Sequence, residues 1–507
     1  MTVSSTDNST LGKRAMRAAS WGYAGMVAKL VIQLGSQIFL ARLLGPETYG
    51  LFAIGAIVIG LSNFLADAGI GAVLVQREEI DEPMIQFVQT FQWLAGLAVA
   101  GLLLISAPII ADFFHEPRAI NIIRAMSGIC FLSAISSVPA NLLRRRLDFK
   151  PLQVAQVSGF FVGYVLVGIP SAWFGMGVWS LVFAWLVQAL VNLFLLYRAA
   201  RPSWRFRLST PHARDALRFG GNALLSNVFT WAGTSVDKVI IGRFFPAADL
   251  GLYNVANNLL STAVTQLLST LQSVLFSASS RMATDRDQIR RSFLALLEIG
   301  TLILLPIFLS IAVVPDVVMA AVYGSKWVAG AELLTPIALS MAMYGISGLV
   351  TPLLWSIGRV DVESRIQLAG AICIVAAGWW AAQTGQVVHV AWAVTACVAA
   401  RSVFTTIWLA RLTSTNLPYV VGAIMGSLIV GITTAAGVYF VCRELQSVAT
   451  APLMLLVAVA IGLVVFIAST LVLCRLGRFP VLMLLAGRVP RLVRYLTVLG
   501  LTRRGIP

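Results

Sequence analysis

Long apolar segments, separated by short polar loops, follow one another along most of the chain. A helix needs about 20 apolar residues to cross the hydrocarbon core of a bilayer. Segments of this kind lie near 18–44, 49–75, 85–111, 120–142, 152–174 and 177–197, then near 217–245, 251–280, 292–321, 331–357, 363–384 and 387–410, and finally near 419–441 and 451–474. The pattern predicts an all-α integral membrane protein of about 14 transmembrane helices, with two parallel six-helix repeats forming two lobes, plus two extra C-terminal helices.

The sequence at the first predicted turn between helices occurs twice. Residues Ala41–Gly55 read ARLLGPETYGLFAIG, and residues Gly242–Ala256 read GRFFPAADLGLYNVA, at a constant offset of 201 residues. In this register Gly50 pairs with Gly251. Both copies join the end of one apolar segment to the start of the next, so we infer a duplicated unit of about 200 residues, as in many transporters.

A basic, proline-containing stretch divides the two predicted lobes. The expected organisation is a cytoplasmic N-terminus (1–17), an N-terminal six-helix lobe (18–200), a cytoplasmic linker (201–214), a C-terminal six-helix lobe (215–412), two additional transmembrane helices (419–476) and a basic amphipathic cytoplasmic tail (477–507).

Composition agrees with a membrane protein, because 58% of the 507 residues are hydrophobic and only 11% are charged. Most of the 37 lysines and arginines fall in alternate loops, which the positive-inside rule assigns to the cytoplasm. Both termini are therefore expected in the cytoplasm. The net charge of +16 is explained by membrane topology, so no nucleic-acid partner is expected.

Polar residues within the predicted spans follow one helical face in both halves. Lys29, Gln33 and Gln37 recur every four residues, and the offset of 201 places Thr230, Thr234 and Lys238 at the same positions. Such residues usually face a bundle interior or an aqueous cavity. The predicted cavity residues are Lys29, Gln33, Gln37, Thr230, Thr234, Asp237, Lys238, Asn254, Asn257, Asn258 and Arg401.

For the uncharged members of this set, hydrogen bonding between helices explains the pattern equally well. Arg401 could instead join the two lobes in an ion pair. Asp67 and Arg124 rank lower, because residues near the ends of spans can reach the interface. Gly69-Ile-Gly71, beside Asp67, indicates no more than a turn or a helix end.

Several chemistries find no support in the sequence. There is no G-x-x-x-x-G-K-[ST] motif, so ATP is not the expected energy source. The three histidines, His115, His212 and His389, are far apart, and the five cysteines occur singly, which predicts neither a metal site nor a disulfide framework. No cofactor is expected; coupling would use a proton or a sodium ion, with Asp237 as the candidate residue.

Four motifs together resemble those of a known family. They are the two turn sequences above, Val322-Tyr-Gly-Ser-Lys-Trp327 followed by Leu333-Leu-Thr-Pro336, and Asn141-Leu-Leu-Arg-Arg-Arg-Leu-Asp-Phe149. In their order along the chain, these motifs resemble those of the polysaccharide transporter branch of the multidrug/oligosaccharidyl-lipid/polysaccharide exporter superfamily. The resemblance covers essentially residues 15–476.

The resemblance implies a V-shaped pair of lobes in a bacterial inner membrane. It implies a flippase, not an enzyme, that moves an undecaprenyl-diphosphate-linked oligosaccharide from the cytoplasmic to the periplasmic leaflet by alternating access. This glycan would be a repeat unit of exopolysaccharide, O-antigen (lipopolysaccharide) or capsule. Membrane lipids, a polysaccharide polymerase and export machinery are the further expected partners. We expect Lys29 and Lys238 to contact the diphosphate as point charges.

Two alternatives belong to other functional classes. An ion-coupled multidrug or small-metabolite antiporter would share the fold but would favour acidic residues in its cavity, whereas the predicted cavity is net basic. A membrane glycosyltransferase or polymerase would need a large outer loop or an acid/histidine site, and the sequence predicts neither.

Overall fold

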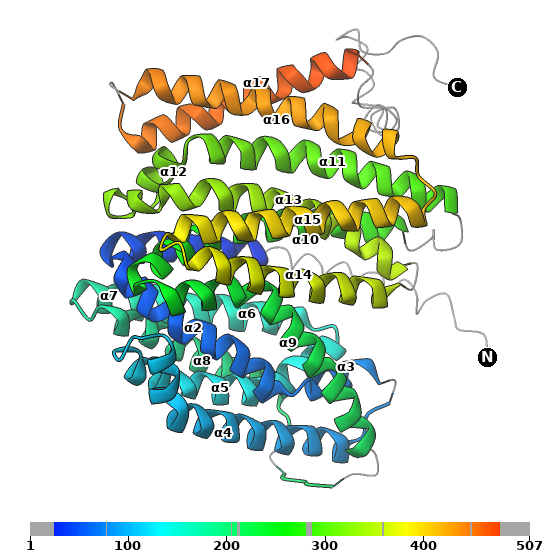
Figure 1. Cartoon of the computed structure of the whole chain (residues 1–507). Coiled ribbons are helices and arrows are strands. Elements are labelled where there is room, and N and C mark those ends of the chain that lie inside the picture. The colour runs from blue at the N-terminus through cyan, green and yellow to red at the C-terminus, as the bar shows by residue number, and fades with distance from the viewer. Residues whose placement is uncertain are drawn as a thin grey trace. The chain divides into compact units, whose positions relative to one another are not determined.

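The computed structural model of the chain (Figure 1) describes residues 25–77, 79–203, 205–209, 213–279, 286–356, 359–446 and 449–476. The chain divides into two compact units, residues 1–254 and 255–507. Every regular element in the described ranges is a helix, which confirms the all-α prediction. The lobe boundary expected at 201–214 stays a prediction, as do the termini, which lie outside the described residues.

The first unit is built around α5 (Ala119–Arg145), which packs against α2, α4 and α8. Its other elements are the first helix (Gly25–Leu43), α2 (Pro46–Asp67), η1 (Ile70–Ala72), α3 (Val73–Gln76), α4 (Glu82–Phe113), α6 (Phe149–Phe160), the π-helical segment η2 (Phe161–Gly168), α7 (Ile169–Trp173), α8 (Val178–Ala200), α9 (Ala213–Phe244) and the beginning of α10 (Ala247–Ser279). α9 packs against α2 and η1 within this unit.

In the second unit α11 (Arg286–Val313) packs between α13 and α16, and α17 lies along α16 (Figure 1). The elements are α12 (Pro315–Val322), η3 (Ser325–Gly330), α13 (Ala331–Ser356), α14 (Val360–Ala382), α15 (Val387–Leu412), α16 (Leu417–Leu445) and α17 (Ala451–Arg475). α14 packs along α15, and α15 packs along α13.

Among the described residues, 12 helices are long and apolar enough to cross a membrane, so the chain is a multi-pass membrane protein. α9 and α10 are not among them, although they have 32 and 33 residues. Their length is sufficient, but they carry the polar residues predicted to line a cavity, and these lower their hydropathy. The total of about 14 spans therefore stays a prediction.

The two copies of the duplicated turn pack directly on each other. A Cβ atom added to Gly50 would overlap the carbonyl oxygen of Ala247, and one added to Gly251 would overlap that of Pro46. The first turns of α2 and α10 are therefore in backbone contact at the two glycines that the sequence register pairs. Only glycine allows two helices to approach this closely.

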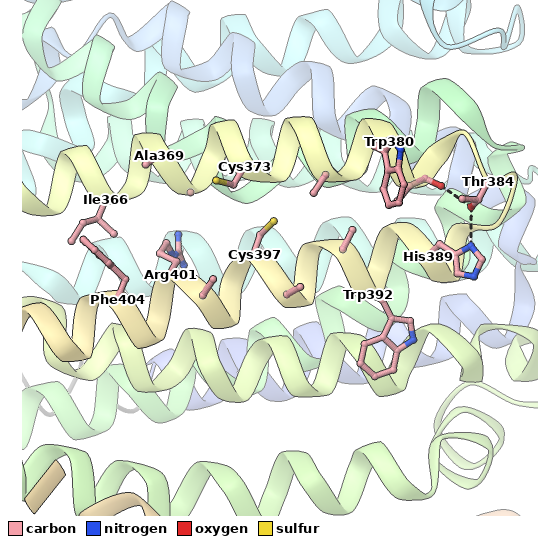
Figure 2. Close-up of a pocket in the computed structure, with 16 residues that line it drawn as sticks. Ile366, Ala369, Cys373, Trp380, Thr384, His389, Trp392, Cys397, Arg401 and Phe404 are labelled. Atoms are coloured by element: carbon pink, nitrogen blue, oxygen red, sulfur yellow. Dashed lines mark hydrogen bonds between the residues drawn. The ribbon is translucent and has the colours of Figure 1, made fainter. Parts of the chain in front are cut away.

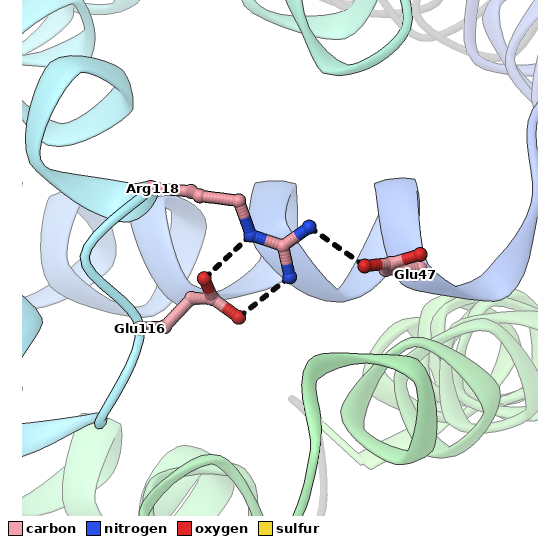
Figure 3. A network of polar contacts seen from close by, with 3 residues as sticks. All are labelled: Glu47, Glu116 and Arg118. Atoms are coloured by element: carbon pink, nitrogen blue, oxygen red, sulfur yellow. Dashed lines mark hydrogen bonds and ion pairs between the residues drawn. The ribbon is translucent and has the colours of Figure 1, made fainter.

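The loop between α4 and α5 is tied to its neighbours by charged side chains (Figure 3). Arg118 donates two hydrogen bonds to Glu116, at 2.7 and 2.9 Å, and a third to Glu47 at the start of α2, at 2.7 Å. These bonds from the guanidinium lower the pKa of Glu116. Arg243, from the second turn sequence, donates to the carbonyl oxygen of Phe113 at 2.7 Å, so it serves as a structural anchor for this loop.

Candidate functional site

A polar cavity of about 450 Å³ lies within the first unit. Its walls come from α2, α5, α6, α8 and α9, which bring hydroxyl and amide groups to one place in an otherwise apolar helical unit. The polar lining residues are Asn63, Asp67, Ser133, Ser136, Ser137, Asn141, Arg144, Gln156, Asn192 and Asn227. Asp67 and Arg144 are the charged residues among those that line it.

Asp67, the last residue of α2, is held by two neutral donors. Ser137 Oγ donates to Asp67 Oδ1 at 2.7 Å, and Gln92 Nε2 donates to the same oxygen at 2.8 Å. Gln92 also donates to Ser137 Oγ, at 3.0 Å, and its side chain is 0% exposed. Hydrogen bonds to the ionised oxygen stabilise the charged form of the carboxyl.

Arg144 is joined to this carboxylate by a chain of hydrogen bonds along α5. Arg144 Nη1 donates to Asn141 Oδ1 at 3.0 Å, and Asn141 Nδ2 donates to Ser137 Oγ at 3.3 Å. The three residues recur at intervals of three and four positions, so they occupy one face of the helix. Arg144 itself is exposed and forms the rim of the cavity.

Two glycines explain how the chain packs so closely around this network. Gly69 has φ +65°, in the left-handed region, and turns the chain from α2 into η1. A Cβ atom added to Gly71 would lie 2.6 Å from Asn141 Nδ2, 2.7 Å from Ser137 Oγ and 2.9 Å from Gln92 Nε2. The Gly-Ile-Gly sequence is therefore more than a helix end, because Gly71 packs directly against the polar network.

Lys29, on the first helix, contacts Gln156, which lines the same cavity. Its Nζ donates to Gln156 Oε1 at 3.2 Å and lies 5.5 Å from the centre of the Phe160 ring. Gln33 and Gln37, one and two turns further on, are half-buried. The carbonyl oxygen of Gln37 accepts a hydrogen bond from Tyr49 at 3.2 Å.

The residues on the predicted polar face of α9 differ in their exposure and in their hydrogen-bond partners. Thr230 and Thr234 are exposed, and their hydroxyls donate to carbonyl oxygens of their own helix. Asp237 accepts a 2.6 Å hydrogen bond from Tyr253 on α10. Lys238 is half-buried, and among the described residues no hydrogen bond or ion pair involves it.

The three predicted asparagines of α10 are at the boundary between the units. Asn254 and Asn257 are buried, and Asn258 is half-buried. Asn254 belongs to the first unit, whereas Asn257 and Asn258 belong to the second. Their role in substrate binding stays a prediction.

Arg401 lies in a different cavity, of about 1050 Å³, between α14 and α15 in the second unit (Figure 2). Alanines, tryptophans and the two cysteines Cys373 and Cys397 make up most of its wall. The Arg401 guanidinium lies 5.9 Å from the centre of the Tyr344 ring, and Gly370 leaves room for its aliphatic part. This cavity is apolar apart from one end with Arg401 and the other with Thr384 and His389, so it does not resemble a site for a hydrated ligand.

Three buried acceptor atoms near the polar cavity are unpaired. Asn63 Oδ1, Asn192 Oδ1 and Gln92 Oε1 accept no hydrogen bond within the described part of the chain. Since buried polar groups are normally paired, these atoms mark where a donor from a ligand or water would bind. Within the same residues there is no group of three or more His, Cys, Asp or Glu side chains that could hold a metal ion.

Most residues of this cavity are not among those that the sequence pattern predicts. Ser137, Asn141 and Arg144 follow one another at intervals of four and three residues, and this helical spacing is the signal that the sequence offers. Asp67 ranks low by sequence because it lies near the end of a predicted span. Gln92, which contacts it, offered no signal because it belongs to a separate helix.

Comparison with known proteins assigns the chain to a family. The lipopolysaccharide biosynthesis protein WzxC of Escherichia coli (strain K12) is 23% identical over 366 residues, 71% of this chain and 73% of that protein. The succinoglycan biosynthesis transport protein ExoT of Rhizobium meliloti (strain 1021) is 27% identical over 384 residues, 74% and 76% of the two chains.

Among solved structures, the lipid II flippase MurJ in an inward closed conformation superposes with a TM-score of 0.72. It is 12% identical, and the match covers 89% of this chain and 98% of MurJ, so the fold is shared. The model of the family described as "Polysaccharide biosynthesis protein" matches residues 39–332, more than half of the chain. This chain therefore belongs to the polysaccharide biosynthesis protein family, as its sequence motifs predict.

Proposed function

We propose that this protein is a flippase that moves an undecaprenyl-diphosphate-linked oligosaccharide from the cytoplasmic to the periplasmic leaflet of a bacterial inner membrane. The observation that carries the proposal is the polar cavity with Arg144 at its rim, inside a unit of membrane-spanning helices. A hydrated glycan with a charged diphosphate cannot cross about 30 Å of hydrocarbon without such a path. The names of ExoT as a transport protein and MurJ as a flippase support transport as the activity.

The diphosphate requires cations, and one lines the cavity while a second lies behind its wall. Arg144 is exposed at the rim, where its planar guanidinium can bind two phosphate oxygens at once. Lys29 lies behind Gln156 and acts as a point charge. Lys238 is a third candidate, because it is half-buried and free of ion pairs among the described residues.

The sugar part requires hydrogen-bonding groups that can serve as donor and acceptor. Asn63, Asn192 and Asn227 bring amides from three different helices to the cavity, and two of them have unpaired buried oxygens. Sugar hydroxyls can donate to those oxygens, so binding would satisfy groups that are costly to leave unpaired.

The basic residues indicate which side of the membrane the cavity faces. Arg144 lies at the same end of α5 as Arg145 and Arg146, and Lys150 follows in the first turn of α6. The positive-inside rule assigns this end to the cytoplasm. The cavity would then load substrate from the cytoplasmic leaflet, with both termini on that side.

Release in the periplasmic leaflet requires a second state that opens the other way, and an ion gradient is the expected energy source. The coupling ion would be a proton or a sodium ion, and no cofactor enters the cycle. A polysaccharide polymerase and export machinery would use the released lipid-linked glycan. The lining carries one acid, Asp67, and one base, Arg144, and Lys29 adds a positive charge behind Gln156, which suits an anionic substrate better than a cationic drug.

The test uses purified protein in liposomes with a fluorescent polyprenyl-diphosphate oligosaccharide, and measures how fast the glycan becomes accessible on the far side. Arg144→Gln should slow transport at least tenfold, since it removes a phosphate contact. Arg146→Gln is the matched control, because Arg146 is also exposed at the end of α5 but does not line the cavity. Equal transport by wild type and Arg144→Gln, at equal insertion, would refute the assignment of this cavity.

A further inference from the structure

Asp67 and Arg144 are opposite charges joined by two neutral side chains. The chain of hydrogen bonds runs from the guanidinium through Asn141 and Ser137 to Asp67 Oδ1. The other elements around the cavity bring uncharged groups toward it: Gln92 from α4, Gln156 from α6, Asn192 from α8 and Asn227 from α9. Arg144 is therefore the nearby charge that compensates the carboxylate, and Lys29 lies beyond Gln156.

The same arginine is the group that an anionic head group would bind at the rim. When a diphosphate binds Arg144, its negative charge offsets the positive charge of the guanidinium. The Asp67 carboxylate then loses the electrostatic stabilisation that Arg144 provides. A half-buried carboxylate without a nearby cation favours its neutral form more than it does beside one, so Asp67 takes up a proton. The two events are linked in both directions, since a coupling free energy between two sites is reciprocal.

Hydrogen-bond acceptors for a protonated Asp67 carboxyl are also present in the structure. Both hydrogen bonds from Ser137 and Gln92 go to Oδ1, so a proton would bind at Oδ2. A protonated carboxyl is a donor and needs an acceptor. Asn63 lies four residues before Asp67 on the same helical face and lines the same cavity, and its buried Oδ1 has no partner among the described residues. The buried Gln92 Oε1 is a second unpaired acceptor.

We propose that Asp67 is a proton-binding site linked through Arg144 to the anionic head group, so that the protein binds one proton when the diphosphate binds and releases it when the diphosphate leaves. The proton comes from water and returns to water, and no covalent bond of the lipid changes. This linkage rests on the proposed function, because it requires a phosphate-bearing ligand at Arg144. It places the coupling proton at Asp67 and not at Asp237, which is not among the residues that line the cavity with Arg144.

The test measures proton uptake on binding of farnesyl diphosphate, a short polyprenyl diphosphate, to the full-length protein in detergent. Titration calorimetry in two buffers of different ionisation enthalpy gives the protons taken up per ligand bound. Wild type should take up nearly one proton more than Asp67→Asn, and the phosphate protons of the ligand cancel in this difference. Wild-type affinity should rise about tenfold from pH 8 to pH 5.5, within the usual 5- to 150-fold range of coupling between sites.

Three variants distinguish linkage from a loss of binding caused by misfolding. Asp67→Asn should bind the ligand at pH 8 as tightly as wild type does at pH 5.5, which an unfolded variant cannot do. Ser137→Ala breaks the hydrogen-bond chain between Asp67 and Arg144. It should reduce the ratio of the affinities at pH 5.5 and pH 8 without removing binding. Asp215→Asn is the control, because its carboxylate is 71% exposed and is paired with Arg77 at 3.5 Å.

The outcomes distinguish the two proposals. If wild type transports the glycolipid but Asp67→Asn takes up as many protons as wild type, the linkage is wrong and the flippase stands. If proton uptake is lost in Asp237→Asn but retained in Asp67→Asn, the proton binds at Asp237 on α9 and the linkage at Asp67 is wrong. If wild type neither binds the diphosphate nor transports the glycolipid, the proposed function fails and the linkage fails with it.

Discussion

Gly71→Ala should disturb the polar network of the first unit more than it disturbs the fold. The added Cβ would lie 2.6 Å from Asn141 Nδ2 and 2.7 Å from Ser137 Oγ, whereas ordinary contact begins at 3.4 Å. The shortfall is about 0.8 and 0.7 Å respectively. Both atoms are at the ends of side chains, so these can move while the helices stay in place.

The energetic consequence follows from the bonds that those side chains make. Displacing Ser137 stretches its 2.7 Å hydrogen bond to Asp67, and bonds to a charged group contribute about 1.5–3 kcal/mol each. Alanine restricts the unfolded chain more than glycine, which offsets about 0.4–1 kcal/mol of this loss. We therefore expect a net destabilisation of about 1–2 kcal/mol and a larger effect on transport, because the chain from Asp67 to Arg144 is interrupted.

The measurement combines thermal unfolding in detergent with transport in liposomes, both compared with Gly101→Ala. Gly101 is also a helical glycine of the first unit, but nothing lies within 4 Å of its Cβ position. This control should keep wild-type transport and gain slightly in stability. Wild-type transport and stability in Gly71→Ala would show that the network does not depend on close packing at this glycine.

Three further predictions concern other parts of the chain. Arg118 lowers the pKa of Glu116 below its unfolded value, so the stabilisation is complete above the unfolded pKa and is lost as the pH falls through the folded pKa. Glu116→Gln should reduce the loss of melting temperature at acidic pH, by an amount equivalent to no more than about 1 kcal/mol because the pair is partly exposed; an unchanged acid profile would contradict this. Tyr253→Phe removes the 2.6 Å hydrogen bond to Asp237 and should lower unfolding stability by about 1.5–3 kcal/mol, whereas a melting temperature equal to that of wild type would mean that water replaces the hydroxyl. Arg401→Met removes a cation from an apolar cavity and should raise the melting temperature; a melting temperature below that of wild type would show that the guanidinium stabilises the fold.

The sequence by itself determined the helical architecture and the duplicated turn. Apolar runs long enough to cross a bilayer are a local property, so the hydropathy pattern predicts them without knowledge of what packs where. The register that pairs Gly50 with Gly251 is equally visible in the letters. That the two turns are in backbone contact at these glycines is known only from the tertiary structure.

Only the tertiary structure decided which polar residues share a cavity. Ser137 is 70 residues from Asp67 and Gln92 is 25 residues from it, and each belongs to a helix whose own periodicity says nothing about the partner helix. A helical face predicts that a residue points inward, but the packing of helices determines what it meets there. For this reason Asp67 looked like a residue at the end of a span, and the fold made it the centre of a charge network.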